Sequence, residues 1–528
     1  MSRKLLSALV ASALVAAAAA VEYALASAAC GGEYVYPIDD TYIHIAMAGN
    51  LAGHGTWGVE PGRMAFCSSS PLWTLLLSGL HLLLGANEFL PWLLSLAFNI
   101  LSVVLTDRLL ARLGANFWSR VGGALAVAIA GPFVCTTALG MEHAAHGFFV
   151  MAAVAAAYAM SAGGTRTVLA ACAAAAAATA TRYESLFILL PLGVGVCALE
   201  MFGRWRAHAR ILPVRGLLFL LSAALPVFAY GLWALAAGGH FLPNSLLLKG
   251  SFHTLPGLLQ AIFLMLGSVR PGCGFLYLLA AALLVVAVLR DTPPFWRIAA
   301  VSAVIAIGGQ MLFASVGQLC RYEAYLTSAG CLVIAAALAS GGIGRFPVAS
   351  APLAVLGLTA WVFADRAERS FADAIRSSSD IRNQQVLMTR MMAELPEEDR
   401  GCVALNDLGY MSLHGGFPFV DLWGLGSQDA TELLLKHPHT WLQDDVKLLF
   451  RSHGVKYAVL FLSWYPEGLM PEGTIDVATL TLKDNFACGS DVVIFRATSP
   501  EAADSLERHL AKYVDRMPPR AVLRLCRR

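Results

Sequence analysis

An adjacent pair of carboxylates, Asp39 and Asp40, follows the first apolar stretch of this sequence. A paired acid in this position can act as a general base or hold a divalent cation. The pair can also cap the helix that the next residues predict, because Asp interacts well with a helix N-terminus. The two uses are compatible, with one Asp capping the helix and the other reactive.

Other ionisable residues stand in short turns between long apolar segments. A charged side chain at membrane depth costs several kcal/mol unless it is paired or faces a wet cavity. Any one of these residues could simply be solvated at the end of a helix. On the topology derived below, however, eight of them fall on the same face and together predict a shared cavity: Asp39, Asp40, Glu142, Arg182, Glu184, Lys249, Arg321 and Glu323.

The composition indicates what kind of scaffold holds these groups. Of the 528 residues, 58% are hydrophobic and only 14% are charged. The mean hydropathy of +0.65 exceeds what a soluble core requires, so the composition predicts a membrane protein. The formal net charge of +2 argues against a nucleic-acid partner, because binders of phosphate backbones carry a clustered basic excess.

The lengths of the apolar runs and the positions of the basic residues define the membrane topology. A crossing helix needs about 20 apolar residues, and cytoplasmic loops favour Lys and Arg. These rules predict a multi-pass protein of the inner or plasma membrane, with a cytoplasmic N-terminus and an extracytoplasmic chain after Asp365. The eleven predicted crossings are 5–26, 88–106, 119–138, 144–161, 167–181, 185–200, 216–236, 273–290, 297–315, 324–340 and 347–364.

Two apolar runs, 71–85 and 256–268, are too short to cross, and we interpret them as membrane-embedded half-segments. If either were a full crossing, the basic cluster at 204–215 would face outward, against the charge rule. The first apolar run also has features of a cleavable signal peptide. A retained helix is the simpler interpretation, because further apolar segments follow it.

The predicted fold is a polytopic α-helical membrane domain, 1–364, with a first external loop at 27–71 and a C-terminal extracytoplasmic α/β domain, 365–528. Interleaved charges and short apolar runs mark the second domain. Its expected strands are 402–406, 456–462 and 491–495, and its expected helices are 428–453 and 500–514.

The eleven cysteines lack the spacing of a metal cluster. Two pairs each lie within one external region and would be able to form bridges if that side is oxidising: Cys30 with Cys67, and Cys402 with Cys488. The sequence alone does not decide either pairing.

A series of short motifs resembles a known family. They span most of residues 30–330: Ile38–Ile43, Asn50-Leu51, Gly53–Gly55, Ser70–Trp73, Gly140–Glu142, Thr181–Glu184, Pro243–Ser245 with Lys249, and Arg321-Tyr322; the external domain adds Asp407–Gly409 and Val420–Leu425. In this order they resemble the GT-C superfamily of polyprenyl-phosphate-sugar-dependent glycosyltransferases, and most of all the mycobacterial terminal arabinofuranosyltransferases and their bacterial relatives. The sequence departs from the family pattern at Tyr183, where Pro is usual, and at His143, where Thr is common.

The resemblance implies inverting transfer of a hexosyl or pentosyl group from a lipid-phosphate donor to a cell-envelope glycan acceptor. Asp40 would be the base, with Asp39 orienting the acceptor or helping to hold a Mg or Mn ion, the one cofactor the motifs suggest. The cations available to the donor phosphate are Lys249, Arg182 and Arg321. The residues expected to contact sugar or acceptor are Glu142, Glu184, His143, Asn244 and Tyr322.

Several alternatives remain open at this point. Glu142 and Glu184 would equally well form buried ion pairs with the arginines. A transporter also carries internal charges in a polytopic bundle, although no inverted repeat is evident and the external domain would be unexplained. A membrane protein that only displays the external domain would tolerate loss of both Asp39 and Asp40. Within the enzyme class, the acceptor could be protein or lipid A.

Overall fold

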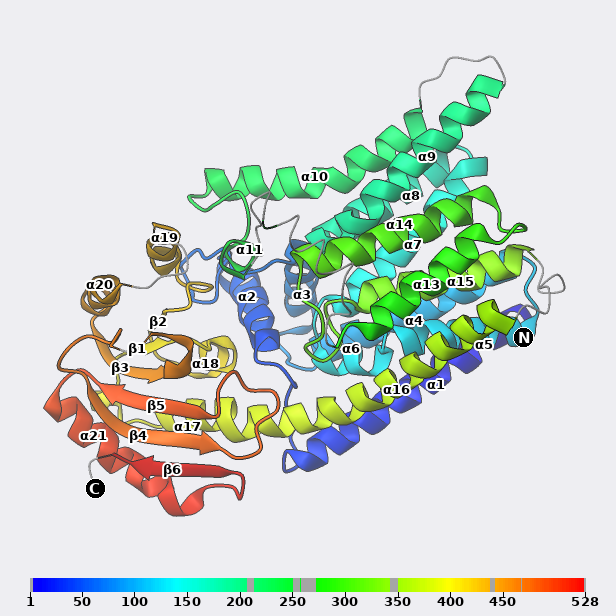
Figure 1. Cartoon of the computed structure of the whole chain (residues 1–528). Coiled ribbons are helices and arrows are strands. Elements are labelled where there is room, and N and C mark those ends of the chain that lie inside the picture. The colour runs from blue at the N-terminus through cyan, green and yellow to red at the C-terminus, as the bar shows by residue number, and fades with distance from the viewer. Residues whose placement is uncertain are drawn as a thin grey trace.

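The computed structural model describes residues 3–206, 213–249, 257, 272–341, 350–436, 442–466 and 468–526. A bundle of long helices forms one part of the molecule, and a domain built on a six-stranded sheet lies at one end of that bundle (Figure 1). The predicted fold class, a polytopic helical membrane domain followed by an α/β domain, is confirmed.

The described residues contain seven helices long and apolar enough to cross a membrane. A bent pair that turns by 47° adds an eighth if it is one span. The seven are α1 (Arg3–Ala29), α4 (Leu90–Arg112), α7 (His143–Ala162), α9 (Leu186–Arg206), α10 (Val214–Ala236), α14 (Pro294–Phe313) and α15 (Ala324–Gly341), and the bent pair is α5 (Phe117–Ala130) with α6 (Phe133–Leu139).

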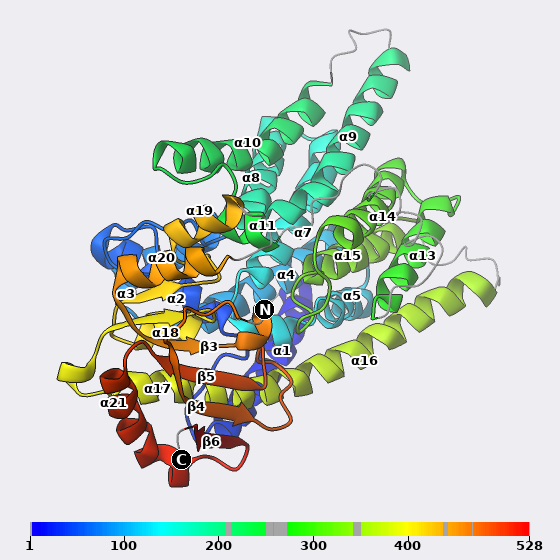
Figure 2. The same cartoon turned by 60° about the vertical axis from the view of Figure 1, so that its left-hand side comes forward.

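Three further helices complete the bundle and coincide with the remaining predicted crossings: α8 (Thr165–Thr181), α13 (Gly274–Val288) and α16 (Ser350–Ile381). All eleven predicted crossings therefore correspond to helices. Exposed leucines follow the surface of α10, as expected where lipid replaces water as the solvent: Leu221, Leu225 and Leu232. This helix extends beyond the rest of the bundle toward the sheet domain (Figures 1 and 2).

Short helices fill the space between the bundle and the sheet domain. They are α2 (Asp40–His54), α3 (Pro71–Leu84), the 3₁₀ turn η1 (Tyr183–Ser185) and α11 (Asn244–Lys249). The predicted half-segment 71–85 is the 14-residue helix α3, which Pro71 begins at a position that needs no backbone donor. The other, 256–268, lies outside the described residues except for position 257, as does the basic cluster at 207–212.

The sheet of the C-terminal domain has the strand order β2-β1-β3-β5-β4-β6. β1 pairs in parallel with β2 and β3, and the other pairings are antiparallel. The strands are β1 (Cys402–Leu405), β2 (Phe419–Asp421), β3 (Val455–Leu460), β4 (Ile475–Leu482), β5 (Val492–Ala497) and β6 (Ala521–Leu525). The three predicted strands are β1, β3 and β5.

Helices and shorter turns cover this sheet. They are the π-helical turn η3 (Arg382–Val386), α17 (Leu387–Ala393), η4 (Glu397–Asp399), α18 (Gly409–His414), α19 (Gln428–Lys436), α20 (Gln443–His453), η5 (Leu462–Trp464), α21 (Pro500–Leu510) and η6 (Ala511–Arg516). The predicted helix 428–453 is two helices, and the predicted helix 500–514 is α21 continued by η6.

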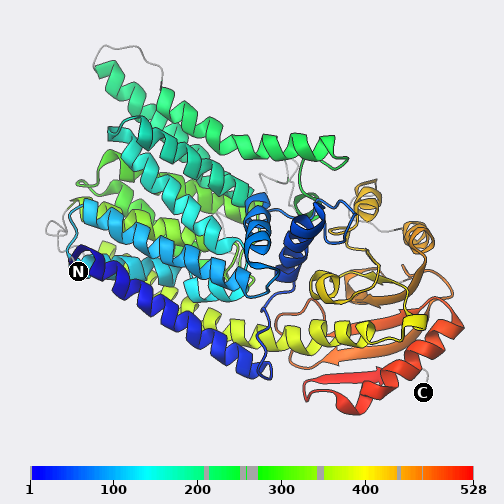
Figure 3. The same cartoon turned by 180° about the vertical axis from the view of Figure 1, so that it is seen from behind.

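The helix α16 joins the two parts without a linker. It runs through the predicted boundary at 364 and continues through η3 into α17, ending at Ala393 beneath the sheet (Figures 1 and 3). The composition of α16 becomes more polar near Asp365 because the surroundings of the helix change there. The helical backbone hydrogen bonds of α16 continue through this point. The connection is therefore stiff.

The first external loop shares a hydrophobic core with the sheet domain. Met47 and Trp57 from the loop region lie in one buried cluster with Met391, Leu408 and Met411 of the C-terminal domain. Burial of such side chains contributes about 1.5–3 kcal/mol each. This shared core fixes the position of α2 relative to both domains.

The cysteines are all free in this structure. Cys67 lies with its sulfur 3.2 Å from Sδ of Met47, and the Cys488 thiol donates to Oε1 of Gln385 at 3.2 Å. Cys30 and Cys67 belong to different buried clusters, as do Cys402 and Cys488. Neither bridge considered from the sequence is formed, because packing carries the partners to separate places.

Candidate active site

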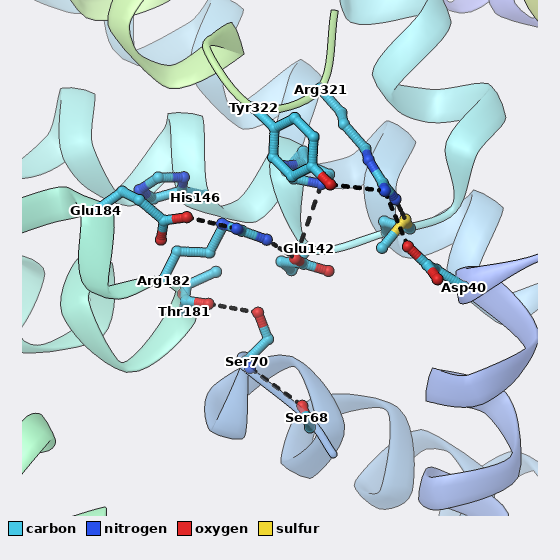
Figure 4. A network of polar contacts seen from close by, with 12 residues as sticks. Asp40, Ser68, Ser70, Glu142, His146, Thr181, Arg182, Glu184, Arg321 and Tyr322 are labelled. Atoms are coloured by element: carbon cyan, nitrogen blue, oxygen red, sulfur yellow. Dashed lines mark hydrogen bonds and ion pairs between the residues drawn. The ribbon is translucent and has the colours of Figure 1, made fainter. Parts of the chain in front are cut away.

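The carboxylate of Asp40 pairs with Arg321, which comes from the loop between α14 and α15. Nη2 of Arg321 donates to Oδ2 of Asp40 at 2.9 Å (Figure 4). The same guanidinium donates to Oε1 of Gln318 at 2.5 Å and to the Tyr322 hydroxyl at 2.9 Å. The Asp40 side chain is 31% exposed and that of Arg321 3%. Asp40 thus combines a charged partner with access from a cavity.

An unusual backbone turn delivers Arg321 to this position. Gln318, Leu319 and Cys320 all have positive φ, at 50°, 57° and 60°. Left-handed conformation costs L-residues about 1–2 kcal/mol each, so the surrounding contacts must hold the turn in place. One such contact is the Cys135 thiol, which donates to the Leu319 carbonyl at 3.3 Å.

Asp39 connects the loop to the sheet domain. Its Oδ2 accepts from the Gly409 N–H at 2.6 Å, and its Oδ1 accepts from the Tyr410 N–H at 2.8 Å. Burial and the nearby Asp407 raise the pKa of the Asp39 carboxyl, whereas the two N–H donors act in the opposite direction. Asp39 is also the residue before α2, but its side chain makes no capping bond to that helix.

This geometry gives Asp39 a structural contact, and the roles predicted for it toward an acceptor or a cation stay predictions. Each of its oxygens already accepts from one backbone donor, although the residue also lines the interface cavity described below. The described residues contain no group of three or more His, Cys, Asp or Glu that could hold a metal ion. A Mg or Mn ion at this pair of aspartates stays a prediction.

A second cluster of charges surrounds Arg182. Its Nη1 donates to Oε1 of Glu142 and its Nη2 to Oε1 of Glu184, both at 2.5 Å (Figure 4). Glu142 stands directly before α7. Gly140, in the turn that precedes it, has a left-handed backbone (φ 59°) and packs against the Tyr36 ring, which would lie only 2.3 Å from a Cβ at that position. The buried ion pairs anticipated as an alternative are thus present.

Sequence reasoning missed His44 in this cluster. Its Nε2 lies 3.3 Å from Oε2 of Glu142, and both side chains are buried. His44 follows Asp40 by four residues on α2, so the two share a helix face. That spacing is the signal that would have identified it.

The phenol ring of Tyr322 and the imidazole ring of His143 complete the cluster. Tyr322 lies beside both arginines, with its ring centroid 4.8 Å from Cζ of Arg321 and 5.7 Å from Cζ of Arg182. His143 is buried, with Nε2 3.8 Å from Oε1 of Glu142 and its ring edge-on to Tyr322. Tyr322 lines both cavities described below, whereas His143 lines neither of them.

Asn244 and Glu323, two of the predicted residues, do not join this cluster in the structure. Asn244 is buried and donates to the Leu425 carbonyl at 3.4 Å, so it supports the contact with the sheet domain. Glu323 pairs instead with Arg366. Lys249 ends α11, but its side chain is outside the part of the chain that the structure describes.

Two cavities meet at Asp40. The bundle cavity, about 340 Å³, is lined by His44, Glu142 and Arg182 together with apolar residues of α9 and α14. The interface cavity, about 1020 Å³, lies between the bundle and the sheet domain. Residues common to both linings are Asp40, Ile43, Ser315, Arg321, Tyr322 and Leu425. Asp40 is thus accessible from two separate spaces.

The fold is similar to that of solved structures of ArnT. The structure of ArnT from Cupriavidus metallidurans bound to undecaprenyl phosphate is similar, with a TM-score of 0.52, 13% identity, and coverage of 93% of this chain and 99% of that one. The apo state of ArnT gives a TM-score of 0.51 at 13% identity, with the same coverage. The arabinofuranosyltransferase AftD from Mycobacteria matches more weakly, with a TM-score of 0.46, 15% identity, and coverage of 92% of this chain and 41% of AftD.

Sequence comparisons add little to this result. Residues 374–503, from the end of α16 to the start of α21, match a family described as a domain of unknown function, DUF8728. No curated protein matches the sequence. The likeness to the solved structures therefore concerns the fold, and the activity has to be argued from the site.

Proposed function

We propose that this protein is an inverting glycosyltransferase that moves a sugar from a polyprenyl-phosphate donor to a cell-envelope glycan, with Asp40 as the general base. The observation that carries the proposal is the position of Asp40 at the boundary of two cavities. A base that serves two substrates has to touch both binding spaces, and a carboxylate within hydrogen-bond reach of the acceptor hydroxyl can take its proton.

The two cavities suit different substrates. The bundle cavity combines Arg182 and Arg321 with the apolar side chains of Leu246, Phe187 and Phe313, a match for a phosphate carried on an isoprenoid chain. Lys249, on the same short helix as Leu246, would add a further positive charge. ArnT, which has the same fold, was solved with undecaprenyl phosphate. The interface cavity would then receive the acceptor.

The chemical step follows from this placement. The acceptor hydroxyl gives its proton to Asp40 while its oxygen forms a bond to the anomeric carbon of the donor sugar. The bond between that carbon and the phosphate oxygen breaks, and its electron pair leaves with the polyprenyl phosphate. Attack from the interface side and departure toward the bundle side invert the anomeric centre. The arginines stabilise the charge that develops on the leaving phosphate.

The Asp40–Arg321 pair would couple donor binding to this step. Without a donor, Arg321 attracts the negative charge of Asp40 and competes with an incoming proton. A donor phosphate offers Arg321 a second anion, and a shift of the guanidinium toward it would leave Asp40 free to accept the proton. The acceptor is then activated only when a donor is present.

The membrane orientation is part of the proposal. The N-terminus of α1, the end of α9 and the start of α10 lie at the end of the bundle away from the sheet domain (Figures 1 and 3). Arg112 and Arg166 stand at the ends of α4 and α8 that are remote from the cavities. Because basic residues favour the cytoplasmic side, we place the cavities and the sheet domain outside.

The test is release of polyprenyl phosphate by the purified protein from a panel of polyprenyl-phosphate sugars. The proposal expects release by the wild type with at least one donor and its loss in Asp40→Asn. Asp515→Asn, an exposed aspartate of η6, is the matched control and should behave as wild type. Silence across the panel, with sugar flux into liposomes that contain the protein, would favour a transporter.

A further inference from the structure

The sheet domain contributes an aromatic wall to the interface cavity that the chemical step does not use. Trp423 and Trp464 both line the cavity and are half-buried. Their ring centroids are 5.0 Å apart in an edge-to-face arrangement. Nε1 of Trp464 donates to the Gly489 carbonyl at 3.0 Å, and a Cβ at Gly489 would lie 2.2 Å from the indole ring. The ring of Trp464 is therefore held in place while part of it faces the cavity.

The charges of the described residues that line this cavity are mainly negative. The described lining residues include four carboxylates and a single guanidinium, which are Asp39, Asp40, Asp373, Asp407 and Arg321. Arg321 is paired with Asp40, and the amide of Gln385, which also lines the cavity, donates to Oδ2 of Asp407 at 2.8 Å. An anionic group entering the cavity would meet an excess of negative charge.

Rigid aromatic faces and carboxylates suit a particular chemical class. Aromatic rings bury the apolar C–H face of a sugar, and carboxylates accept hydrogen bonds from its hydroxyl groups. Like charges brought together across an interface cost several kcal/mol, so the same carboxylates would reject a phosphorylated ligand. The volume lies at the upper end of the ~300–1,000 Å³ of ordinary ligand sites, which leaves room for an oligosaccharide.

We infer that the interface cavity binds an uncharged glycan acceptor against Trp423 and Trp464 and discriminates against acceptors that carry phosphate. The inference rests on the proposed function and names the acceptor class of that site. It distinguishes a neutral glycan from a phosphate-bearing acceptor such as lipid A. It also gives the sheet domain a direct part in choosing the acceptor.

The test measures binding by the full-length protein without a donor, so that no turnover is needed. The probes are neutral tetrasaccharides of arabinose, mannose and galactose, and the same compounds with one phosphate monoester. We expect at least one neutral probe to bind, and its phosphorylated form to bind at least about 10-fold more weakly. This difference in affinity should become smaller in high salt, which screens the repulsion between like charges. Equal or tighter binding of the phosphorylated form, or no binding of any neutral probe, would overturn the inference.

Variants separate the contribution of the aromatic rings from that of the carboxylates. Trp464→Ala should weaken binding of the neutral probe about 10-fold, equivalent to about 1.4 kcal/mol, because the aromatic face is lost. Trp464→Phe should restore part of the affinity. Trp118→Ala, at the exposed start of α5, is the matched control. The double variant Asp373→Asn, Asp407→Asn should reduce the difference in affinity between the neutral and the phosphorylated probe. If this difference in affinity is unchanged while the melting temperature is preserved, the carboxylates do not discriminate against phosphate.

The failure of this inference and the failure of the proposed function give different results. Slow release of polyprenyl phosphate to water needs a donor and Asp40 but no acceptor. If that release occurs and the neutral probes do not bind, the acceptor assignment is wrong and the glycosyltransferase stands. If neutral probes bind and no donor is ever cleaved, the proposed function is wrong.

Discussion

Asp40 and Arg321 are 281 positions apart in the chain, yet their side chains lie 2.9 Å apart at the boundary of the two cavities. The pair connects the first external loop with the last loop of the bundle. Since Arg321 lines both cavities, any ligand that attracts its charge also changes the surroundings of Asp40. In the proposed function, donor binding and acceptor activation would therefore be linked through this one guanidinium.

Replacing Arg321 with Lys should therefore affect donor use more than folding. Lys keeps the charge but loses the fork that reaches Asp40, Gln318 and Tyr322 together. A charge-assisted hydrogen bond contributes about 1.5–3 kcal/mol, so its loss should raise the donor KM by roughly 10- to 100-fold in steady-state kinetics. Arg451→Lys, on the exposed side of α20, should change nothing. A donor KM unchanged in Arg321→Lys would argue against this role.

The contact of Asp39 with the sheet domain predicts a steric effect at Gly409. A Cβ there would lie 2.0 Å from the Asp39 carbonyl oxygen, so Gly409→Ala must push α18 away from the loop. Overpacking of this kind costs about 1–3 kcal/mol, and thermal unfolding should show a lower melting temperature. Gly79→Ala is the control, because nothing lies within 4 Å of a Cβ at that position on α3. Equal melting temperatures for the two variants would show that the contact is not tight.

The buried charges around Arg182 should be strongly coupled in stability. Glu142→Gln leaves part of the guanidinium charge without its partner, and loss of one member of a buried pair costs about 3–5 kcal/mol. The double variant Glu142→Gln, Arg182→Gln should lose less than the sum of the single changes. Denaturation of the four proteins in detergent gives the coupling energy. Additive losses would mean that the two residues do not interact in the folded state.

Acid should destabilise the sheet domain through His509. Burial lowers the pKa of this residue, whose Nε2 lies 2.8 Å from the Met391 carbonyl. The folded state therefore binds the proton more weakly than the unfolded chain, whose pKa is about 6.5. The stability is fully present above that value and is lost as the pH falls toward the lower folded pKa. Melting temperatures between pH 7.5 and 5.5 should fall less in His509→Gln than in the wild type, and parallel curves would exclude the effect.

Sequence patterns predicted the location of the site better than its contacts. Apolar run lengths placed Glu142, Arg182 and Arg321 in turns on one face, and the structure brings them to one cavity. Glu323 stands in one of the same turns but pairs with Arg366 on α16. Run length indicates where a turn lies, whereas the direction of a side chain depends on helices distant in the sequence.

The two aspartates illustrate the same limit. They are adjacent, so sequence alone could not divide their roles. Asp40 begins α2 and shares a face with His44, whereas Asp39 is oriented by backbone donors of Gly409 and Tyr410, about 370 positions away. Only the packing of the sheet domain on the loop distinguishes Asp40, which lines both cavities, from Asp39, which binds backbone donors and lines one cavity.

Fold boundaries show where composition misleads. β2, β4 and β6 were not predicted. β2 has only three residues, and a charged residue interrupts the apolar positions of β4 and β6, which pair with each other on the far side of β5. α16 crosses the expected domain boundary, since the change in polarity at Asp365 marks a change of solvent and not the end of a helix. Long apolar helices were predicted well because the membrane fixes both their length and their composition.

Comparison of Asp40→Asn with Asp39→Asn tests the central claim most directly. Sugar transfer would be measured at saturating donor and acceptor, with melting temperature and donor affinity measured on the same samples. We predict that Asp40→Asn loses about 10²–10⁴-fold in kcat and keeps its melting temperature and donor affinity. Asp39→Asn should melt earlier, because an amide cannot accept from both backbone donors, but should retain turnover while folded. Turnover preserved in Asp40→Asn and lost in folded Asp39→Asn would contradict the claim.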